Sequence, residues 1–341
     1  MTVRVGILGG GNISGTHALA ASAIPGVEVV AVHGVNAEKA AALADRFGAA
    51  AHAEREEFLR HRPMELVLVG SPSGRHGEDA AAAAREGLHV LVEKPLEISV
   101  ERVDALLDTC DRAGVRLGVF YQGRTAPEVE WVKRLIADGR LGRPFLAAAQ
   151  VRWFRPPEYY ADSRWRGTWA LDGGGALMNQ GIHTVDLLLW LLGEVRVVSA
   201  LSAAALHSIE VEDTLVATLE FASGALATLE TTTAAFPGYS RRVEISGTEG
   251  TVLLENDRVL RADLRSGPAA PPRADADGSP SASSPVVSDV RGHRRVIEDF
   301  LHALRTGTEP LCGGSEGRRS VAVVEALYRS ARSGAPVHLG A

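Results

Sequence analysis

The first 120 residues alternate short apolar runs with alanine-rich stretches, and this alternation restricts the possible folds more than any other feature. Apolar runs of strand length, separated by stretches of helical length, predict βαβ units with parallel neighbouring strands. We therefore expect an α/β domain with a doubly wound parallel sheet. Its strands are expected at 3–8, 27–33, 66–70, 89–93 and 116–121, and its helices near 13–24, 37–47, 54–61, 75–87 and 99–113.

The pattern changes after residue 123. A helix at 128–138 leads through a strand at 145–153 and a long aromatic loop to a second helix at 176–191. The β-rich segments that follow are separated by Ser-Gly and Thr-Glu-Gly turns, which predict an antiparallel meander. The sequence thus predicts a nucleotide-binding domain at 1–123 and an α+β domain at 124–341. The second domain is expected to have strands at 195–203, 214–221, 225–233, 241–246 and 251–255, a mobile loop at about 266–288, and closing helices near 292–306 and 315–333.

Composition and charge narrow the class of function. The formal net charge of -6 argues against a nucleic-acid binder, which normally carries a basic face. No apolar run approaches the roughly 18 residues that span a bilayer, and the N-terminus lacks the features of a signal peptide. The cysteines, Cys110 and Cys312, form no Cys-x-x-Cys pair, so neither a disulfide framework nor a metal site is expected. The sequence indicates a cytoplasmic protein without a nucleic-acid or membrane partner.

Several candidate ligand-binding residues fall at or just after the ends of the expected parallel strands. Ligands of doubly wound sheets bind at the carboxyl ends of the strands. The residues found there are Gly9, His33, Ser71, Lys94 and Gln122. Their shared position is stronger support for a ligand site than any one motif.

A glycine-rich loop joins the first expected strand to the first helix. Gly9 allows a tight turn, Gly11 lets the backbone approach a pyrophosphate, and the helix that starts at Asn12 and Ile13 offers amide donors. Position 14 is Ser14, a small residue that still permits close helix–strand packing. A glycine-rich turn without a ligand is the alternative, but its place in a βαβ unit favours a dinucleotide.

The second strand lacks the acidic residue that usually holds the ribose 2′-hydroxyl of NAD. No carboxylate stands at 33–36, whereas Lys39 follows on the first helical turn, and His33 and Asn36 can donate hydrogen bonds. This pattern favours NADP over NAD. The alternative is that Lys39 is solvated and that backbone groups hold an unphosphorylated ribose.

Two proton-handling side chains come from separate parts of the chain. Lys94 follows an apolar strand and precedes Pro95, which keeps its backbone extended, and it can stabilise a developing alkoxide or move its proton. Asn179, His183 and Asp186 are spaced i, i+4 and i+7 and are expected on one helix face. Three glycines before this helix permit close approach of a ligand, so we favour acid–base catalysis by His183 over a buried structural histidine. Asp186 is expected to orient neighbouring groups.

Together these motifs resemble the Gfo/Idh/MocA oxidoreductases, a family that includes glucose–fructose oxidoreductase and inositol 2-dehydrogenase. The resemblance extends over nearly the whole chain and is specific for the family, though not for a substrate. It rests on Gly9, Gly11, Asn12 and Ile13; on Ser71, Pro72 and His76; on Glu93, Lys94 and Pro95; on Gly173, Asn179, His183 and Asp186; and on the segments 316–321 and 328–331.

The resemblance implies a Rossmann domain followed by an α+β domain with an open, mainly antiparallel sheet. Such sheets commonly form subunit interfaces in the family, so a homodimer or homotetramer through the C-terminal sheet is expected. It also implies that Lys94 and His183 are catalytic. The nicotinamide half of NAD or NADP is expected to contact Ser71, Pro72, His76, Glu93, Lys94 and Gln122.

One position departs from the pattern of the family. Many members carry Asp where this chain has Asn179, and an amide does not titrate near neutral pH. A relay from lysine through an aspartate to histidine is therefore not available. Asn179 can still hydrogen-bond a substrate hydroxyl, and some members that act on nucleotide-linked amino sugars look similar here.

The aromatic loop at 153–169 holds three of the five tryptophans and several arginines. Aromatic faces pack on the C–H surfaces of sugars, and arginines hold hydroxyls, carboxylates or phosphates. Packing between domains is the alternative. Within the chain, Arg124 and Arg166 are expected to contact substrate, together with Lys94, Asn179 and His183.

The sequence therefore predicts an NAD(P)-dependent dehydrogenase or reductase. Its expected substrate is a secondary alcohol or ketone of a sugar, sugar derivative or cyclitol. The first alternative is a redox-assisted glycosidase or lyase of the same family, in which transient oxidation acidifies a neighbouring C–H bond. The second is a non-catalytic nucleotide sensor, against which the presence of both Lys94 and His183 argues.

Overall fold

The computed structural model describes residues 2–272 and 289–340, which divide into two compact units. Unit 1 comprises Met1–Gln122 and Val290–Arg318, and unit 2 comprises Gly123–Asp289 and Arg319–Ala341. Of the mobile loop expected at 266–288, residues 273–288 lie outside the described residues.

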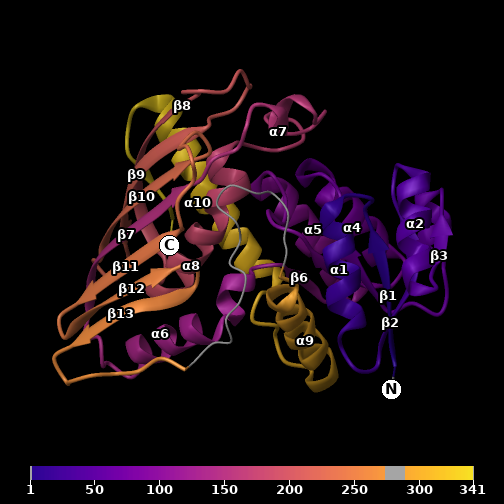
Figure 1. Ribbon diagram of the computed structural model, residues 1–341, viewed down its shortest axis with the longest axis horizontal. Helices are drawn as coiled ribbons and strands as arrows, with labels where there is room; N and C mark the ends of the chain where they lie inside the picture. The colour runs from indigo at the N-terminus through magenta and orange to yellow at the C-terminus, as the bar shows by residue number, and fades with distance from the viewer. Residues whose placement is uncertain (1, 273–288, 341) are drawn as a thin grey trace. The chain divides into compact units, whose positions relative to one another are not determined.

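Unit 1 contains a parallel six-stranded sheet (Figure 1). Its strands are β1 (Val3–Leu8), β2 (Val27–His33), β3 (Ala50–His52), β4 (Leu66–Val69), β5 (His89–Val92) and β6 (Leu117–Val119). They lie in the order β3-β2-β1-β4-β5-β6, and every neighbouring pair is parallel. The order reverses between β1 and β4, which is where doubly wound sheets bind dinucleotides. The predicted Rossmann fold is confirmed.

The helices of unit 1 begin and end where local chemistry allows. They are α1 (Asn12–Ser22), α2 (Ala37–Phe47), α3 (Arg55–Leu59), α4 (His76–Arg85) and α5 (Val100–Ala113), with a short turn η1 (Ser73–Arg75) before α4. The side chains of Asn36 and Ser99 cap α2 and α5 by accepting from backbone amides. Gly48 and Gly114 end the same helices with φ of 64° and 67°, a left-handed conformation that glycine adopts without strain.

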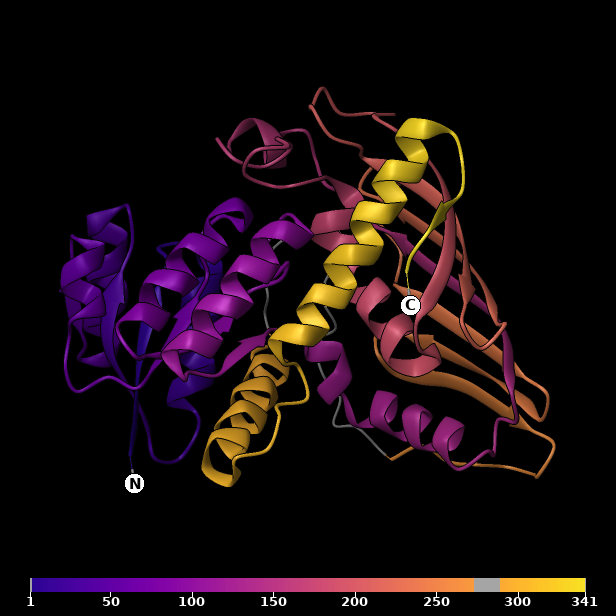
Figure 2. The ribbon, with the colours of Figure 1, turned by 180° about the vertical axis from the view of Figure 1, so that it is seen from behind.

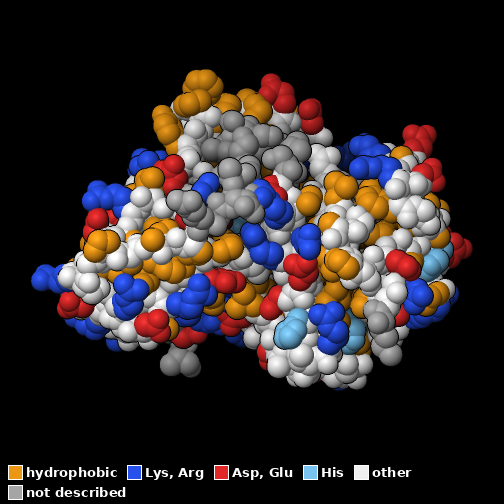
Figure 3. All heavy atoms as spheres, turned by 60° about the horizontal axis from the view of Figure 1, so that its bottom comes forward, with side chains coloured by type: hydrophobic (Ala, Val, Ile, Leu, Met, Phe, Trp, Pro, Cys, Tyr) orange, Lys and Arg blue, Asp and Glu red, His pale blue; other side chains and the backbone are white. Residues whose placement is uncertain are grey.

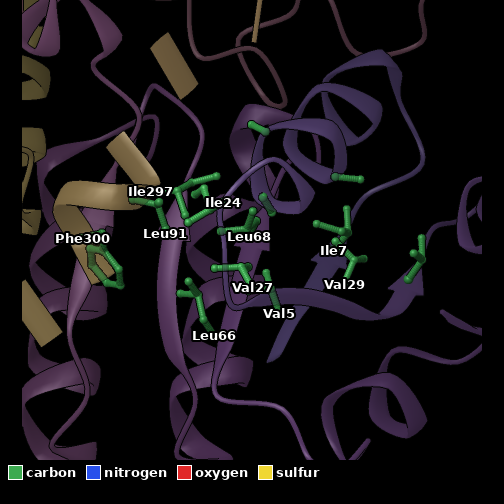
Figure 4. Close-up of a cluster of buried hydrophobic side chains, with 14 of the residues drawn as sticks. Val5, Ile7, Ile24, Val27, Val29, Leu66, Leu68, Leu91, Ile297 and Phe300 are labelled. Atoms are coloured by element: carbon green, nitrogen blue, oxygen red, sulfur yellow. The ribbon is translucent and has the colours of Figure 1, made fainter. Parts of the chain in front are cut away.

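A helix from the C-terminal part of the chain completes the core of unit 1. Helix α9 (Arg291–Thr306) places Ile297 and Phe300 in the same buried cluster as Val5, Leu68 and Leu91 (Figure 4). Its contribution makes unit 1 discontinuous in sequence, which differs from the expected division into 1–123 and 124–341. The apolar side chains on one face of α9 account for the difference, because they are buried in this core.

Unit 2 is built on a mixed eight-stranded sheet (Figures 1 and 2). Its strands are β7 (Pro144–Arg152), β8 (Val195–Ala203), β9 (Thr214–Phe221), β10 (Leu226–Thr232), β11 (Arg242–Gly247), β12 (Gly250–Glu255), β13 (Arg258–Leu264) and β14 (Val337–His338). The order is β13-β12-β11-β7-β10-β9-β8-β14. Strand β7 lies parallel to β10 and separates two antiparallel meanders, so the predicted meander is split by one parallel pair.

Helices cover one face of this sheet. Among the described residues these are α6 (Pro127–Ala137), the turn η3 (Ala176–Gly181), α8 (Ile182–Leu192) and most of α10 (Gly314–Ser333) (Figure 2). The connection from β7 to η3 contains a short helix, α7 (Glu158–Ala161). The opposite face of the sheet carries no helix in the described part of the chain. Its large apolar side chains include Leu146, Leu201, Val216 and Leu226, which are 46–68% exposed.

The surface mixes charges of both signs. On the face drawn in Figure 3, lysine and arginine side chains are interspersed with aspartate and glutamate. Helices long and apolar enough to cross a membrane are not found among the described residues.

Candidate active site

The carboxyl edge of the parallel sheet in unit 1 carries the residues predicted to bind a dinucleotide. Gly9 follows β1, His33 ends β2, Ser71 and Pro72 follow β4, Glu93 and Lys94 follow β5, and Gln122 opens the turn η2 (Gln122–Thr125) after β6. Because all six strands are parallel, these positions share one edge of the sheet. The structure therefore has these residues at the strand ends, as predicted. The binding role of each residue stays a prediction.

The loop between β1 and α1 fits a pyrophosphate. Gly9 has φ of 139°, and a Cβ there would lie 2.6 Å from the carbonyl oxygen of Gly70. A Cβ at Gly11 would meet no protein atom within 4 Å, so the open space beside the loop is available to a ligand. Helix α1 begins at Asn12 with no side-chain cap and no acidic residue in its first turn, which leaves its amide groups suited to an anion.

At the end of β2, one residue expected to donate to a phosphate, Asn36, caps the next helix, α2. Its Oδ1 accepts from the Lys39 backbone 2.9 Å away. The His33 ring contacts the carbonyl oxygen of His52, with Nδ1 at 3.1 Å. Lys39 is exposed on the first turn of α2. Asn36 is thus engaged in the helix cap, whereas the Lys39 side chain is exposed beside it.

His76 joins the two loops that follow β4 and β5. Its Nδ1 lies 2.7 Å from the carbonyl oxygen of Pro95, and its Nε2 lies 2.8 Å from that of Ser71. The ring is buried. His76 therefore fixes the chain after Lys94 relative to Ser71, which is consistent with a role in shaping the nicotinamide side of the site.

A buried carboxylate precedes Lys94. Glu93 Oε1 lies 3.0 Å from Nε2 of His17 on α1 and 3.2 Å from Nε2 of His293 on α9. Its other oxygen, Oε2, accepts from the backbone N–H of Lys94 at 3.2 Å. The side chain of Gln122 lies 2.8 Å from the same nitrogen of His293. This network connects the phosphate-loop helix, the residue beside Lys94 and helix α9.

Hydrogen bonding sets the charge state of this network. Burial alone would raise the pKa of Glu93, but the hydrogen bonds from His17 and His293 outweigh burial and hold that pKa well below its usual value. Burial lowers the pKa of His17, and the nearby Glu93 carboxylate offsets only part of this effect. Near neutral pH we therefore expect an ionised Glu93 that accepts from a neutral His17.

The same three residues also have the spacing of a metal site, since their ligand atoms lie within 4.8 Å of one another. Imidazoles that bind a metal almost always donate their second N–H to a partner. The Nδ1 atom of His17 is buried and has no hydrogen-bond partner among the described residues. Hydrogen bonds therefore explain this cluster better than a metal does.

The residues around His183 lie in unit 2 on an irregular turn. The helix expected at 176–191 begins as a π-helix, Ala176–Gly181, and continues as α8 from Ile182. Asn179 lies on the π-turn, where its Nδ2 donates to Asp172 at 2.6 Å. His183 lies on the first turn of α8 and is half-buried. Single π-turns occur frequently at functional sites, and a shared face of Asn179 and His183 stays a prediction.

Glu212 and Tyr328 hold the start of the π-turn. The carboxylate of Glu212 accepts from the backbone amides of Gly175 at 3.0 Å and Leu177 at 2.8 Å, and from the Tyr328 hydroxyl at 2.9 Å. A Cβ at Gly175 would lie 1.7 Å from the carbonyl oxygen of Glu212, so this close approach requires glycine. Burial raises the pKa of Glu212 to about 7, although all three donors favour its ionised form.

Arg124 and Asp186 form a buried ion pair within unit 2. Arg124 is 1% exposed, and its Nε and Nη2 donate to the two oxygens of Asp186 at 2.9 and 2.6 Å. Ser320 donates to the same carboxylate at 3.2 Å. The Asp186 carboxylate therefore holds the guanidinium of Arg124 in place. Substrate contact by Arg124 stays a prediction, and this geometry favours a structural role.

The sequence missed four of these supporting residues: His17, His293, Glu212 and Tyr328. His17 and His293 are 276 positions apart, so no local pattern could pair them. Tyr328 lay in a tail segment noted only as part of the resemblance. One signal in the sequence could have indicated a buried His17: it stands in an alanine-rich helix that must pack against the sheet.

A parallel sheet with a dinucleotide-type loop and a lysine at the same edge defines a nucleotide-binding oxidoreductase fold. Comparison with known families agrees. Residues 3–121 match the oxidoreductase family with an NAD-binding Rossmann fold, and residues 129–253 match the GFO/IDH/MocA C-terminal domain. The chain belongs to the GFO/IDH/MocA oxidoreductase family, which confirms the resemblance found in the sequence.

Individual relatives cover nearly all of the chain. The structure of the WlbA dehydrogenase from Bordetella pertussis, in complex with NADH and UDP-GlcNAcA, is 34% identical with a TM-score of 0.89, over 100% of this chain and 98% of that one. Inositol 2-dehydrogenase of Rhizobium meliloti is 28% identical over 97% of each chain. D-xylose 1-dehydrogenase (NADP(+)) 2 of Haloferax volcanii is 29% identical over 98% of this chain and 99% of its own length. The protein is therefore an NAD-binding oxidoreductase.

Proposed function

We propose that this enzyme transfers hydride between a nicotinamide cofactor and a secondary alcohol or ketone of a sugar, sugar derivative or cyclitol. The observation that carries the proposal is the position of Lys94. It lies two residues after the end of buried strand β5, and its backbone is held by Glu93 at the sheet edge that also carries the phosphate loop. The relatives named above act on or bind molecules of these classes.

Lys94 and His183 divide the proton chemistry. In the oxidation direction the carbinol C–H bond breaks and its hydride leaves, while the hydroxyl proton passes to His183. The ammonium group of Lys94 hydrogen-bonds the developing alkoxide. When bound, the nicotinamide supplies the hydride acceptor. Lys94 belongs to unit 1 and His183 to unit 2, so their meeting in one active site is part of the proposal.

The cofactor site comprises backbone and side-chain groups of unit 1. We assign the pyrophosphate to the loop from Gly9 to Ile13, where the uncapped start of α1 and the open space at Gly11 suit an anion. The nicotinamide half is assigned to the residues after β4, β5 and β6. These are Ser71, Pro72, His76, Glu93, Lys94 and Gln122.

Lys39 favours NADP over NAD in this proposal. No carboxylate stands at 33–36 to hold a ribose 2′-hydroxyl, and Lys39 is exposed on the adjoining helical turn. We expect Lys39→Ala to weaken NADPH binding about tenfold and to leave NADH binding within about twofold, measured by fluorescence titration. Equal effects on both nucleotides would reject this role for Lys39.

Asn179 is proposed to contact a substrate hydroxyl. Its amide nitrogen is held by Asp172, and the Nε2 of Gln180 lies 3.2 Å from its Oδ1. This arrangement fixes the amide without giving it a titratable proton. Asn179 thus positions substrate, and proton transfer is assigned to Lys94 and His183.

The open face of the unit 2 sheet is proposed to bind a second copy of the chain. Leu146 and Leu226 lie opposite each other on β7 and β10 and are 48% and 55% exposed. Exposed apolar pairs on a sheet face are typical of interfaces. Replacing both leucines with glutamate is expected to halve the mass measured by light scattering, whereas Val35→Glu in unit 1 leaves it unchanged. A monomeric wild type would reject the proposal.

The decisive experiment follows nicotinamide absorbance across sugars, sugar acids and cyclitols with NAD and with NADP. We expect turnover with at least one class, and a loss of about 10²–10⁴-fold in kcat for Lys94→Ala with nucleotide binding retained. Lys39→Ala serves as the matched lysine control and retains turnover with NAD. Tightly held nucleotide with sugar cleavage but no net absorbance change would instead support the redox-assisted hydrolase.

A further inference from the structure

The connection between β7 and the π-turn gathers arginines around aromatic rings. The guanidinium carbon of Arg166 lies 4.4 Å from the ring centre of Tyr159 and 4.8 Å from that of Trp165. The guanidinium of Arg155 lies 5.6 Å from the same tyrosine ring. Two cationic side chains therefore share one aromatic platform within unit 2.

Arg166 differs from Arg124 and Arg152 of the same unit in its partners. Arg124 binds Asp186, and Arg152 binds Glu230 with Nε at 2.9 Å. The side chain of Arg166 makes no ion pair or hydrogen bond with any residue that the structure describes. The Nε atom of Arg166 is fully buried, and the residue as a whole is half-buried. Its contacts are the faces of aromatic rings.

Asp172, an acidic residue of this connection, accepts hydrogen bonds from the amide of Gly167 at 2.9 Å and from Asn179 at 2.6 Å. Burial lowers the pKa of Arg155, and the positive charge of Arg166 lowers it further. Arg155 and Arg166 thus place two positive charges beside one partly buried aromatic ring, where an anionic ligand would be stabilised.

Ring stacking fixes the plane of a guanidinium and leaves its N–H edge for a planar acceptor. Arginine in this geometry binds carboxylates and phosphates through two parallel hydrogen bonds. The cluster also connects to the proposed substrate site. The Tyr159 hydroxyl lies 3.4 Å from Nε2 of Gln180, which is hydrogen-bonded in turn to Asn179, four residues before His183.

We propose that Arg166, stacked on Tyr159 and Trp165, binds an anionic group of the substrate, a carboxylate or a phosphate. The enzyme would then select charged sugars over neutral ones. This inference rests on the proposed function, because it names the substrate class of the same site. Arg166 is accordingly a specificity-determining residue and takes no part in proton transfer.

The test measures binding of matched sugars to the full-length protein loaded with NADH, by titration calorimetry. D-Glucuronate and D-glucose 6-phosphate are each compared with D-glucose. We expect the wild type to bind at least one charged sugar about tenfold more tightly than D-glucose. A preference for glucuronate assigns a carboxylate, and a preference for the phosphate ester assigns a phosphate.

Three variants separate charge from structure. Arg166→Gln is expected to lose the preference, with its affinity for the charged sugar reduced to about that for D-glucose. Arg166→Lys keeps the charge without the planar fork and is expected to lie between Arg166→Gln and the wild type. Arg152→Gln, which changes an exposed arginine of the same unit, is expected to behave as the wild type. Circular dichroism confirms that each variant is folded.

Equal affinity of the wild type for charged and neutral sugars, or the absence of measurable binding of either charged sugar, would overturn the proposal. So would an unchanged preference in Arg166→Gln. The proposed function fails separately. A preference for charged sugars without nicotinamide turnover of any sugar would support the anion site and reject the dehydrogenase. Turnover of neutral sugars without a preference for charged ones would support the dehydrogenase and reject the anion site.

Discussion

Glu93 in unit 1 and Glu212 in unit 2 are both buried, and each holds the segment that carries a proposed catalytic residue. Glu93 accepts from the backbone of Lys94, and Glu212 accepts from the turn that leads into His183. Their pKa values nevertheless move in opposite directions. The pKa of Glu93 lies well below its usual value, whereas burial raises that of Glu212 to about 7.

The partners explain the difference. Two imidazoles, from His17 and His293, face one oxygen of Glu93, and their hydrogen bonds and electrostatic attraction together lower its pKa. Glu212 receives only neutral donors, namely two backbone amides and the hydroxyl of Tyr328. Burial alone therefore does not determine how a carboxylate titrates, because the hydrogen-bond donors decide whether desolvation is overcome.

The largest expected effect compares removal of the two carboxylates at pH 7.5. Glu93→Ala leaves buried imidazole and amide donors without an acceptor and should lower the free energy of unfolding by about 3–5 kcal/mol. Glu212→Ala also strands its donors but removes a carboxylate that is costly to ionise, so a loss of about 1–2 kcal/mol is expected. Urea unfolding measures both, and equal losses would break the comparison.

The second effect concerns pH. Because the pKa of Glu212 is raised from 4.5 to about 7, the native state binds more protons than the unfolded state between these values, and its stability falls as pH rises through this window. Glu212→Gln removes the titrating group. The difference in unfolding free energy between wild type and variant should change by about 3 kcal/mol from pH 4.5 to pH 7.5.

The control for the pH experiment is Glu244→Gln, which changes an exposed glutamate on strand β11 of the same sheet. Its pH profile of unfolding should match that of the wild type. If the unfolding free energy of Glu212→Gln fell with pH between 4.5 and 7.5 as steeply as that of the wild type, another group would titrate in this range. The two buried glutamates would then not differ as described.

How far the sequence predicted these regions follows from the range of the interactions. The parallel strands of unit 1 were predicted because each is a short apolar run between helices, and β4 is buried at every position. Strand β3 was missed because Ala50–His52 lacks β-branched residues. Strand β13 was missed because its charged, largely exposed residues follow no apolar pattern, although Asn256 and Asp257 before it have the positive φ of a tight hairpin turn.

The candidate site divides in the same way. Residues at strand ends, such as Gly9 and Lys94, were placed correctly because a parallel sheet fixes where its strands end. The π-turn at Asn179 and the contact of Glu93 with His293 depend on packing between segments far apart in sequence. Neither helical periodicity nor residue spacing contains that information, so only the folded chain reveals them.

The smallest effect tests the unit 1 network by removing one of its two imidazoles. His293→Phe keeps an aromatic ring beside Phe120, whose centre lies 5.3 Å from that of His293, but it loses the hydrogen bond to Glu93. We expect a loss of about 1.5 kcal/mol at pH 7.5, since His17 still donates to the carboxylate. The exposed His302→Phe on the same helix is the control and should change little.

The pH dependence of His293→Phe completes the argument. Glu93, with its lowered pKa, contributes stability that is present above the unfolded pKa near 4.5 and is lost as pH falls through the folded value. With one donor gone, the folded pKa moves back toward the unfolded one, so the variant and the wild type should become equally stable in acid. Circular dichroism during acid titration measures this convergence. A gap that persists at the lowest pH would mean that His293 stabilises unit 1 by packing alone, and that Glu93 owes its low pKa to His17.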